Sequence, residues 1–442
     1  MLTRRAALCR TLSVPAGALL ACRSARLTPD QPVQPAKGPV TLRLHIQDGS
    51  YAQWSQKWGE RFTREHPQIT IVVEPFPTAG QEYHTKIKTM LATQTLGDLV
   101  CTWCTQGLLG EFSHLGVWRP LDDLVRADRF DLGQYYPAII EGMKFRGSLM
   151  GLPFHGHPGF PFFFYNIDLF AKHGVALPDE RWTLETLADA ARRLSVTDPS
   201  GAEQYGWFSV AGYHGLIVWA RLWGGDLISV DGRKSELASA ATRAAIQWIV
   251  DARFRHGFEP PPQRLAGRGN VNDLFAAGLF AMMHGDSAQV STMHHRVRET
   301  FRWSVALLPP GPGGARGALA TPHIMGITSQ CKAVAEAWTF LKSYTSKEAG
   351  VDKALDGAGV PGGRPDAWND PRILAAVPQY TIVARAFEWA RPEHAPANFR
   401  GLEASSTIDR ELQPVFAGTE DVSAGVLKAS DALQRVIDLP VV

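Results

Sequence analysis

Hydrophobic and polar positions beyond the N-terminal segment alternate between the period of a strand and that of a helix. Apolar residues at every second position over 40–46 and the apolar-rich stretch 69–74 predict two strands, and the stretch 98–101 predicts a third. Aromatic residues four apart over 52–65 and a one-sided apolar pattern over 83–93 predict the intervening helices. This strand–helix–strand–helix–strand order predicts an α/β fold whose parallel sheet is covered by helices.

The first twenty-two residues have the pattern of an export signal. Arg4 and Arg5 precede the mostly apolar stretch 12–21, which is too short to span a bilayer. The stretch ends in Leu19-Leu-Ala-Cys22, which resembles a bacterial lipobox, so we expect lipidation at Cys22. An ordinary secretion signal in which Cys22 is incidental is the alternative. The paired arginines leave twin-arginine and general export both open.

The residues that follow the signal predict a flexible tether and then a large folded body. Residues 23–39 are rich in proline and poor in apolar residues, so they offer no core. No later stretch is apolar enough for a second membrane span. The remaining chain of about 400 residues is long for one compact core, which predicts two domains.

Composition excludes some partners and favours others. The chain of 442 residues has a formal net charge of +2 and no basic block, which argues against nucleic acid as a partner. It contains thirteen Trp residues. Many of these are expected in the core, but Trp and Tyr also stack on the C–H faces of sugars.

Cys101 and Cys104 have the spacing of a redox pair or half a metal site. A redox pair opens a helix, whereas here a strand-like run leads into the first cysteine. No second Cys or His pair with zinc spacing stands nearby. We therefore expect either a local disulfide or two buried thiols, with Cys331 unpaired.

Several segments, taken in order, resemble one known family. They are 62–67, 115–123, Phe145-Arg-Gly-Ser-Leu-Met-Gly-Leu-Pro153, 163–172, 177–183, Phe275-Ala-Ala-Gly-Leu-Phe-Ala-Met-Met-His-Gly285 and 335–348. In their order and spacing the chain resembles the extracellular solute-binding proteins of bacterial ABC importers, family 1, carbohydrate type. Two positions depart from the pattern: Phe162 stands where a small residue is usual, and Ser287 where a sugar-stacking Trp is common.

The resemblance implies a two-lobed periplasmic-binding-protein fold, type II-like, with a cleft between lobes joined by hinge segments. Lobe 1 would comprise 40–151 plus 318–362, and lobe 2 would comprise 152–317 plus 363–442. It further implies a monomeric, exported, lipid-anchored protein of the periplasm or the outer face of the cell membrane. Such a protein captures a sugar or oligosaccharide by hinge closure and delivers it to the permease subunits of the importer, without cofactor or catalysis.

Aromatic and polar residues in segments after strands are the candidate ligand-binding residues. The candidates are Ser50, Tyr51, Thr102, Trp103, His155, Trp207, Trp223, Gly225, Asp286, His323 and Arg364. Of these, His323 is expected in the loop before the stretch 324–327. Trp103 and Asp286 match positions of the family that face the cleft, whereas Trp219 and Trp223, four apart, also fit a core stripe. His155 and His157 suggest a metal, but no third ligand is evident in the sequence, so no metal site is predicted.

Two other functions remain open from the residues. The same type of receptor could carry a glycerol phosphodiester or another polar metabolite, which calls for several Arg or Lys side chains or a helix N-terminus in the cleft. Arg364 is the single candidate for that role. An exported saccharide hydrolase is the other alternative, because Asp and Glu are abundant enough for a carboxylate pair, although no catalytic motif is present.

Overall fold

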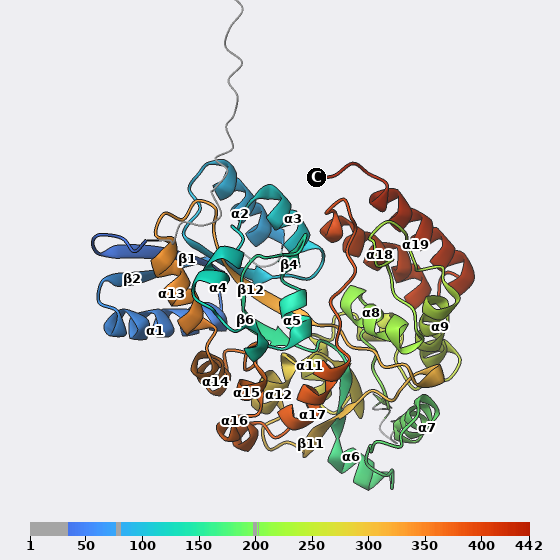
Figure 1. Ribbon diagram of the computed structural model, residues 1–442. Helices are drawn as coiled ribbons and strands as arrows, with labels where there is room; N and C mark the ends of the chain where they lie inside the picture. The colour runs from blue at the N-terminus through green and yellow to red at the C-terminus, as the bar shows by residue number, and fades with distance from the viewer. Residues whose placement is uncertain (1–33, 77–80, 198–200, 202) are drawn as a thin grey trace, which may run out of the picture. The chain divides into compact units, whose positions relative to one another are not determined.

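The computed structural model describes residues 34–76, 81–197, 201 and 203–442 (Figure 1). The export signal, the predicted lipidation site Cys22 and most of the tether lie outside these residues. Among the helices that are described, none combines the length and the apolar character that crossing a membrane requires.

The first sheet has five strands in the order β2-β1-β3-β12-β6. They are β1 (Val40–Gln47), β2 (Ile69–Phe76), β3 (Leu99–Trp103), β6 (Leu152–His157) and β12 (Thr321–Ile327). Strand β1 pairs in parallel with β2 and β3, as the alternating pattern predicts. Strand β12 is antiparallel to both β3 and β6, so the sheet as a whole is mixed.

Helices α1 (Ser50–Glu65) and α2 (Gln81–Ala92) connect the three parallel strands. Trp54, Trp58 and Phe62 of α1 are buried, which confirms the predicted apolar face. The rings of Trp54 and Trp58 stack at 5.3 Å. On the same side of the molecule lie α13 (Val334–Tyr344) and α14 (Lys347–Leu355), in line with the late helix expected from the sequence (Figure 1).

The second sheet has three antiparallel strands in the order β10-β7-β11. They are β7 (Phe162–Asn166), β10 (Met282–Gly285) and β11 (Trp303–Leu307). All five residues of β7 are buried, which explains its continuous apolar run and the place of the large Phe162.

Helices α8 (Tyr213–Leu222), α9 (Ala240–Phe254), α18 (Gly401–Phe416) and α19 (Val422–Ile437) pack together beside this sheet (Figure 1). The remaining elements are short, apart from α7 and α12. They are α3 (Leu108–Leu115), α4 (Asp122–Ala127), η1 (Leu132–Gln134), α5 (Pro137–Glu141), β4 (Lys144–Phe145), β5 (Ser148–Leu149), α6 (Ile167–Lys172), α7 (Leu184–Leu194), β8 (Val196–Thr197), β9 (Glu203–Gln204), α10 (Pro262–Leu265), α11 (Val271–Ala276), α12 (Gln289–Val297), η2 (Pro312–Gly314), α15 (Pro365–Trp368), α16 (Pro371–Ala376), α17 (Tyr380–Arg385) and η3 (Ala386–Glu388).

Residues 152–157, which follow the predicted first crossing between lobes at 151/152, form β6 and pair with β12 in the first sheet. The chain leaves this sheet after His157. The boundaries of the predicted lobes stay predictions.

Cys101 and Cys104 are both free and buried. Of the two outcomes expected for this pair, the structure has the buried thiols rather than the local disulfide. Cys331 is also free, as expected, and is partly exposed.

Candidate functional site

Three imidazoles, those of His155, His157 and His323, lie together on the first sheet; we call them the histidine cluster. Strand β12 pairs with β6 so that His323 is directly opposite His155. His157 lies two residues along β6 and therefore points to the same face. The ring of His155 is 4.6 Å from that of His323 and 5.2 Å from that of His157, centroid to centroid.

Tyr51, in the first turn of α1, brings a phenol to this cluster. Its hydroxyl oxygen lies 3.3 Å from His155 Nε2. Its ring meets Phe154 and His323 edge to face, with centroids 6.0 and 6.4 Å apart. Gly359, which has a φ of 147°, packs against it: a Cβ there would lie 2.7 Å from a ring carbon of Tyr51. Only glycine allows this approach.

Residues that follow β10 of the second sheet reach the same cluster. His157 Nδ1 is 2.8 Å from Ser287 Oγ and 3.6 Å from Asp286 Oδ1. The backbone N–H of Ala288 donates to that Asp286 oxygen at 2.6 Å, which fixes the carboxylate. Polar groups carried by both sheets thus meet at His157.

Burial sets the charge state of these groups. It lowers the pKa of His157 and holds the pKa of both His155 and His323 well below the usual range, and the nearby His157 and Lys353 lower the pKa of these two further. Burial also raises the pKa of Asp286, which His157 partly opposes, and that of Tyr51. The cluster therefore presents neutral imidazoles and a neutral phenol, which can both donate and accept hydrogen bonds.

Lys353, which lies near the cluster, and the candidate cation Arg364 are both already engaged. Lys353 is buried and donates a hydrogen bond to the carbonyl oxygen of Phe154, and burial lowers its pKa to about 7. The guanidinium of Arg364 pairs with the carboxylate of Asp366 at 2.7 Å and also donates to Gln134.

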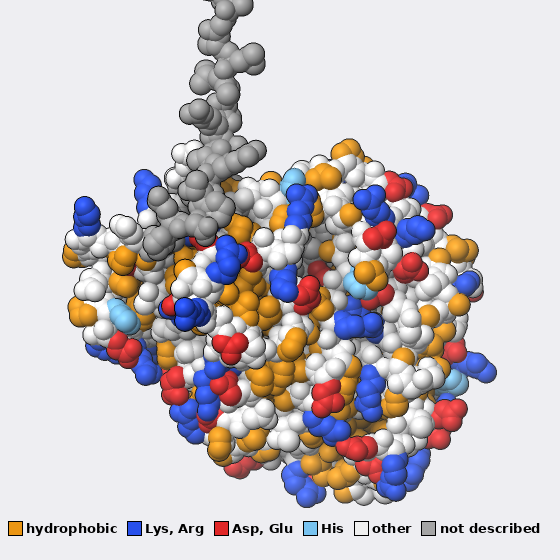
Figure 2. Space-filling model, viewed as in Figure 1, with side chains coloured by type: hydrophobic (Ala, Val, Ile, Leu, Met, Phe, Trp, Pro, Cys, Tyr) orange, Lys and Arg blue, Asp and Glu red, His pale blue; other side chains and the backbone are white. Residues whose placement is uncertain are grey.

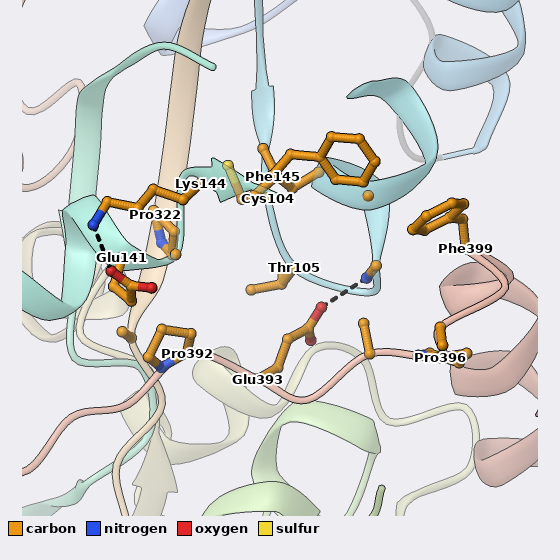
Figure 3. Close-up of a pocket in the computed structure, with 17 residues that line it drawn as sticks. Cys104, Thr105, Glu141, Lys144, Phe145, Pro322, Pro392, Glu393, Pro396 and Phe399 are labelled. Atoms are coloured by element: carbon orange, nitrogen blue, oxygen red, sulfur yellow. Dashed lines mark hydrogen bonds and ion pairs between the residues drawn. The ribbon is translucent and has the colours of Figure 1, made fainter. Parts of the chain in front are cut away.

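A hollow lies on the other face of β12, where Pro322 points away from the side of His323. This hollow, the Glu393 pocket, has a volume of about 260 Å³ (Figure 3). It is lined by Cys104, Thr105, Gly107, Leu109, Gly110, Glu141, Gly142, Lys144, Phe145, Ala320, Pro322, Pro392, Glu393, Ala395, Pro396, Ala397 and Phe399. The Phe145 and Phe399 rings lie at one side, with centroids 5.4 Å apart.

Glu393 is the central polar group of this pocket. It accepts a hydrogen bond from the backbone N–H of Gly107 at 2.7 Å (Figure 3) and another from the Tyr213 hydroxyl at 3.2 Å. Burial raises its pKa to about 7 against the lowering effect of the backbone donors. Sequence reasoning missed this residue, because it stands in an irregular stretch with no motif around it.

A comparison with known families matches residues 47–351 to the bacterial extracellular solute-binding proteins. The chain belongs to this family. A binding protein of Brucella abortus (strain 2308) is 26% identical over 314 residues, which cover 67% of this chain and 71% of the relative. The mannitol-binding protein of Pseudomonas aeruginosa is 23% identical over 404 residues, which cover 83% and 84% of the two chains.

Among solved structures, an ABC substrate-binding protein of Listeria monocytogenes in complex with cycloalternan superposes with a TM-score of 0.78. The two sequences are 18% identical, and the superposition covers 90% of this chain and 99% of the Listeria protein. The likeness confirms the two-lobed α/β fold that the sequence predicts.

The sequence-predicted residues of this solute-binding protein divide into two groups. Tyr51, His155, Asp286 and His323 come together at the histidine cluster. His323, expected in a loop, lies instead within β12, where antiparallel pairing brings it opposite both His155 and Trp103.

Four other candidates lie outside the contacts that define this cluster. Trp103, the last residue of β3, is partly exposed and meets His84 edge to face at 4.5 Å. Thr102 is buried, and its hydroxyl lies 3.2 Å from His84 Nε2. Ser50 is exposed at the start of α1, and Arg364 is held in its ion pair.

Three candidates of the second lobe lie elsewhere in the solute-binding protein. Trp207 is completely buried in the second core, where its indole N–H donates to Ser209 Oγ at 2.7 Å. Trp223 lines a separate hollow with Trp248. Gly225 packs against Thr242, whose hydroxyl oxygen would lie 2.8 Å from a Cβ. These contacts give the three residues packing roles in the described part of the chain.

Proposed function

We propose that this chain is the substrate-binding protein of an ABC importer and captures a sugar or oligosaccharide at the histidine cluster. The observation that carries the proposal is the contact of His157 with Ser287 and Asp286, because it joins elements of both sheets at one polar point. A ligand held there touches both lobes only when they close, which is how binding selects the closed state.

The chemistry of the cluster suits a polyhydroxylated ligand. Neutral imidazoles and the Tyr51 hydroxyl supply donors and acceptors, and the Phe154 and Trp103 rings supply apolar faces. The proteins to which the chain is similar include one named for mannitol and one solved with cycloalternan.

A phosphodiester ligand is the second candidate, and the charges disfavour it. A phosphate group needs donors that remain available to it, preferably Arg or Lys. Lys353 is occupied by a backbone carbonyl, and Arg364 by Asp366 and Gln134. On the face shown in Figure 2, Lys and Arg side chains are interspersed with Asp and Glu.

A thermal-shift screen of the purified chain tests this function. Mono- and oligosaccharides, sugar alcohols and glycerol phosphodiesters are added in turn, and the melting temperature is measured. A saturable rise with one class of saccharide supports the proposal, because a ligand that binds only the folded state stabilises it. Stabilisation by phosphodiesters alone overturns the sugar. Release of reducing sugar without stabilisation overturns the receptor in favour of a hydrolase.

Two variants then test the site with the saccharide that the screen identifies. Trp103→Ala and Asp286→Ala are each expected to weaken binding at least about 10-fold, roughly 1.4 kcal/mol. Trp223→Ala is the matched control, because Trp223 lines a separate hollow and is expected to leave the dissociation constant unchanged. Equal losses in all three variants, or a loss in Trp223→Ala alone, would place the ligand elsewhere.

The anchor and the partner complete the proposal. Cys22 is acylated and holds the protein at the bacterial membrane, from which the monomeric receptor delivers its ligand to the permease subunits. The support is the sequence Leu19-Leu-Ala-Cys22 after a short apolar run. Mass spectrometry of the N-terminal peptide from isolated membranes tests the acylation, and acylated Cys22 is expected. A Cys22→Ser variant is expected to be released from the membrane in soluble form.

A further inference from the structure

The three imidazoles of the histidine cluster form a donor set that the function proposed above does not require. One ring nitrogen from each of His155, His157 and His323 lies within 4.8 Å of the other two. Rings i and i+2 on β6 and a cross-strand partner on β12 converge on one face, so two backbone ladders hold their positions. Separate surface histidines do not have this arrangement.

The ring nitrogens of the cluster are sparsely hydrogen-bonded. Within the described residues, neither nitrogen of His323 has a hydrogen-bond partner, and His157 uses Nδ1 alone. In the described part of the chain, the ring nitrogens of His155 share one hydrogen-bond partner, the Tyr51 hydroxyl, at 3.5 Å from Nδ1 and 3.3 Å from Nε2. His323 is partly exposed, so its two nitrogens are open to a ligand, and they converge with those of the two other rings.

The surroundings of His157 match those of a metal-bound imidazole. A ligating histidine commonly donates its second N–H to a carboxylate or hydroxyl, which fixes the ring and strengthens the ligand. Here Nδ1 faces Ser287 Oγ at 2.8 Å and Asp286 Oδ1 at 3.6 Å, which leaves Nε2 for a metal. This requires the tautomer with the proton on Nδ1, so the Gly159 N–H at 3.3 Å from that nitrogen gives up its bond.

We propose that His155, His157 and His323 bind one divalent transition-metal ion, with Zn²⁺ the preferred occupant, and that Asp286 supports the site from behind His157. Three imidazoles are a known zinc donor set that leaves a fourth position open for water or a ligand oxygen. The Asp286 carboxylate lies behind the ring of His157, 3.6 Å from Nδ1, where the backbone N–H of Ala288 holds it.

The required adjustment is small. Zinc–nitrogen bonds of about 2.0–2.1 Å place ligand nitrogens of a tetrahedral site about 3.3 Å apart. The widest separation in the cluster is 4.8 Å or less, so the rings close by about 1.5 Å at most. Rotation about the side-chain bonds covers that distance without a change in strand register.

The test is a calorimetric titration of the full chain with ZnCl₂ alone, after removal of metals with EDTA and without any saccharide. One Zn²⁺ per chain is expected. His323→Gln removes a ring that forms no hydrogen bond with the described residues, and it is expected to weaken binding more than about 100-fold; Asp286→Asn is expected to weaken it about 10–100-fold. His256→Gln, at an exposed position outside the cluster, is the matched control and is expected to bind Zn²⁺ like the parent.

A spectroscopic measurement keeps the proposal testable if a variant fails to fold. Zinc-edge X-ray absorption of the unmodified loaded chain is expected to show three imidazole ligands. Less than one bound ion per chain, an oxygen-only environment, or equal losses in His256→Gln and His323→Gln would each overturn the site. Because no saccharide is present, failure here leaves the proposed sugar function standing, and failure of the saccharide screen leaves the zinc titration to stand by itself.

Discussion

His157 Nδ1 and Ser287 Oγ lie 2.8 Å apart, although His157 belongs to the first sheet and Ser287 follows a strand of the second. Both side chains are buried, so the hydrogen bond between them is shielded from water. A buried hydrogen bond across two sheets contributes to stability and fixes their relative position at that point.

Ser287→Ala should therefore lower the free energy of unfolding by about 1–2 kcal/mol, because it leaves a buried imidazole nitrogen with a weaker partner. Urea titration followed by tryptophan fluorescence measures the change. Ser329→Ala is the matched control: the hydroxyl of Ser329 donates to the carbonyl of Gly116, but the residue is exposed, so a change below about 0.5 kcal/mol is expected. Similar losses in the two variants would show that the His157 contact has no special weight.

The elements of the first sheet could be predicted because each depends on local pattern. Strand 40–46 and helix 52–65 appear as β1 and α1, displaced by at most two residues at either end. The pattern could not reveal that β12, more than two hundred residues after β3, inserts between β3 and β6 in antiparallel orientation. Long-range strand pairing leaves no local signal in the sequence.

The lack of a local signal for long-range strand pairing also explains why the site could be predicted only in part. His155 and His157 were recognisable as a pair because they are two residues apart, whereas their third partner, His323, depends on the register of β12 against β6. Trp207 looked like a sugar-stacking residue by type, yet it packs in the second core. Residue type suggests a role, but burial decides it.

Glu393 should make stability depend on pH. Burial raises its pKa from 4.5 to about 7, so between these values the folded state holds a proton that the unfolded state has lost. The contribution of this protonation to the free energy of unfolding is complete below about pH 4.5. It falls as pH rises towards 7, by about 3 kcal/mol in total. Glu393→Gln cannot ionise and keeps an acceptor for the Gly107 N–H, so its stability relative to the parent should rise over this range.

Urea unfolding of both proteins at a series of pH values measures this difference. The comparison of parent with variant cancels the contributions of the buried histidines, which act in the opposite direction at low pH. Glu388→Gln, at an exposed position of η3, is the control and should track the parent at every pH. A Glu393→Gln curve parallel to the parent's from pH 4.5 to 7 would refute the prediction.

Cys101 and Cys104 should be unreactive in the folded protein. Burial raises the pKa of both thiols well above its usual range, so little of the reactive thiolate forms at neutral pH. Iodoacetamide labelling followed by peptide mass mapping should find both unmodified in the native chain and both modified in guanidinium. Rapid native labelling would contradict the burial, and a disulfide-joined peptide would contradict the free thiols.

Gly359 is the position where a single methyl group should disturb the histidine cluster without removing any of its polar atoms. A Cβ at this residue would lie 2.7 Å from Tyr51 Cε1 and 3.0 Å from His155 Cε1, and the φ of 147° is strained for an L-residue. Gly359→Ala should therefore cost about 1–3 kcal/mol of stability and weaken ligand binding by displacing Tyr51.

Gly147→Ala separates the backbone strain from the contact with Tyr51, because Gly147 also has a positive φ, 85°, but a Cβ there would meet nothing within 4 Å. That control should lose about 1–2 kcal/mol of stability from the backbone alone and bind ligand normally. Thermal unfolding and titration with the saccharide measure both effects. Unchanged affinity in Gly359→Ala would mean that the Tyr51 ring is not part of the ligand site.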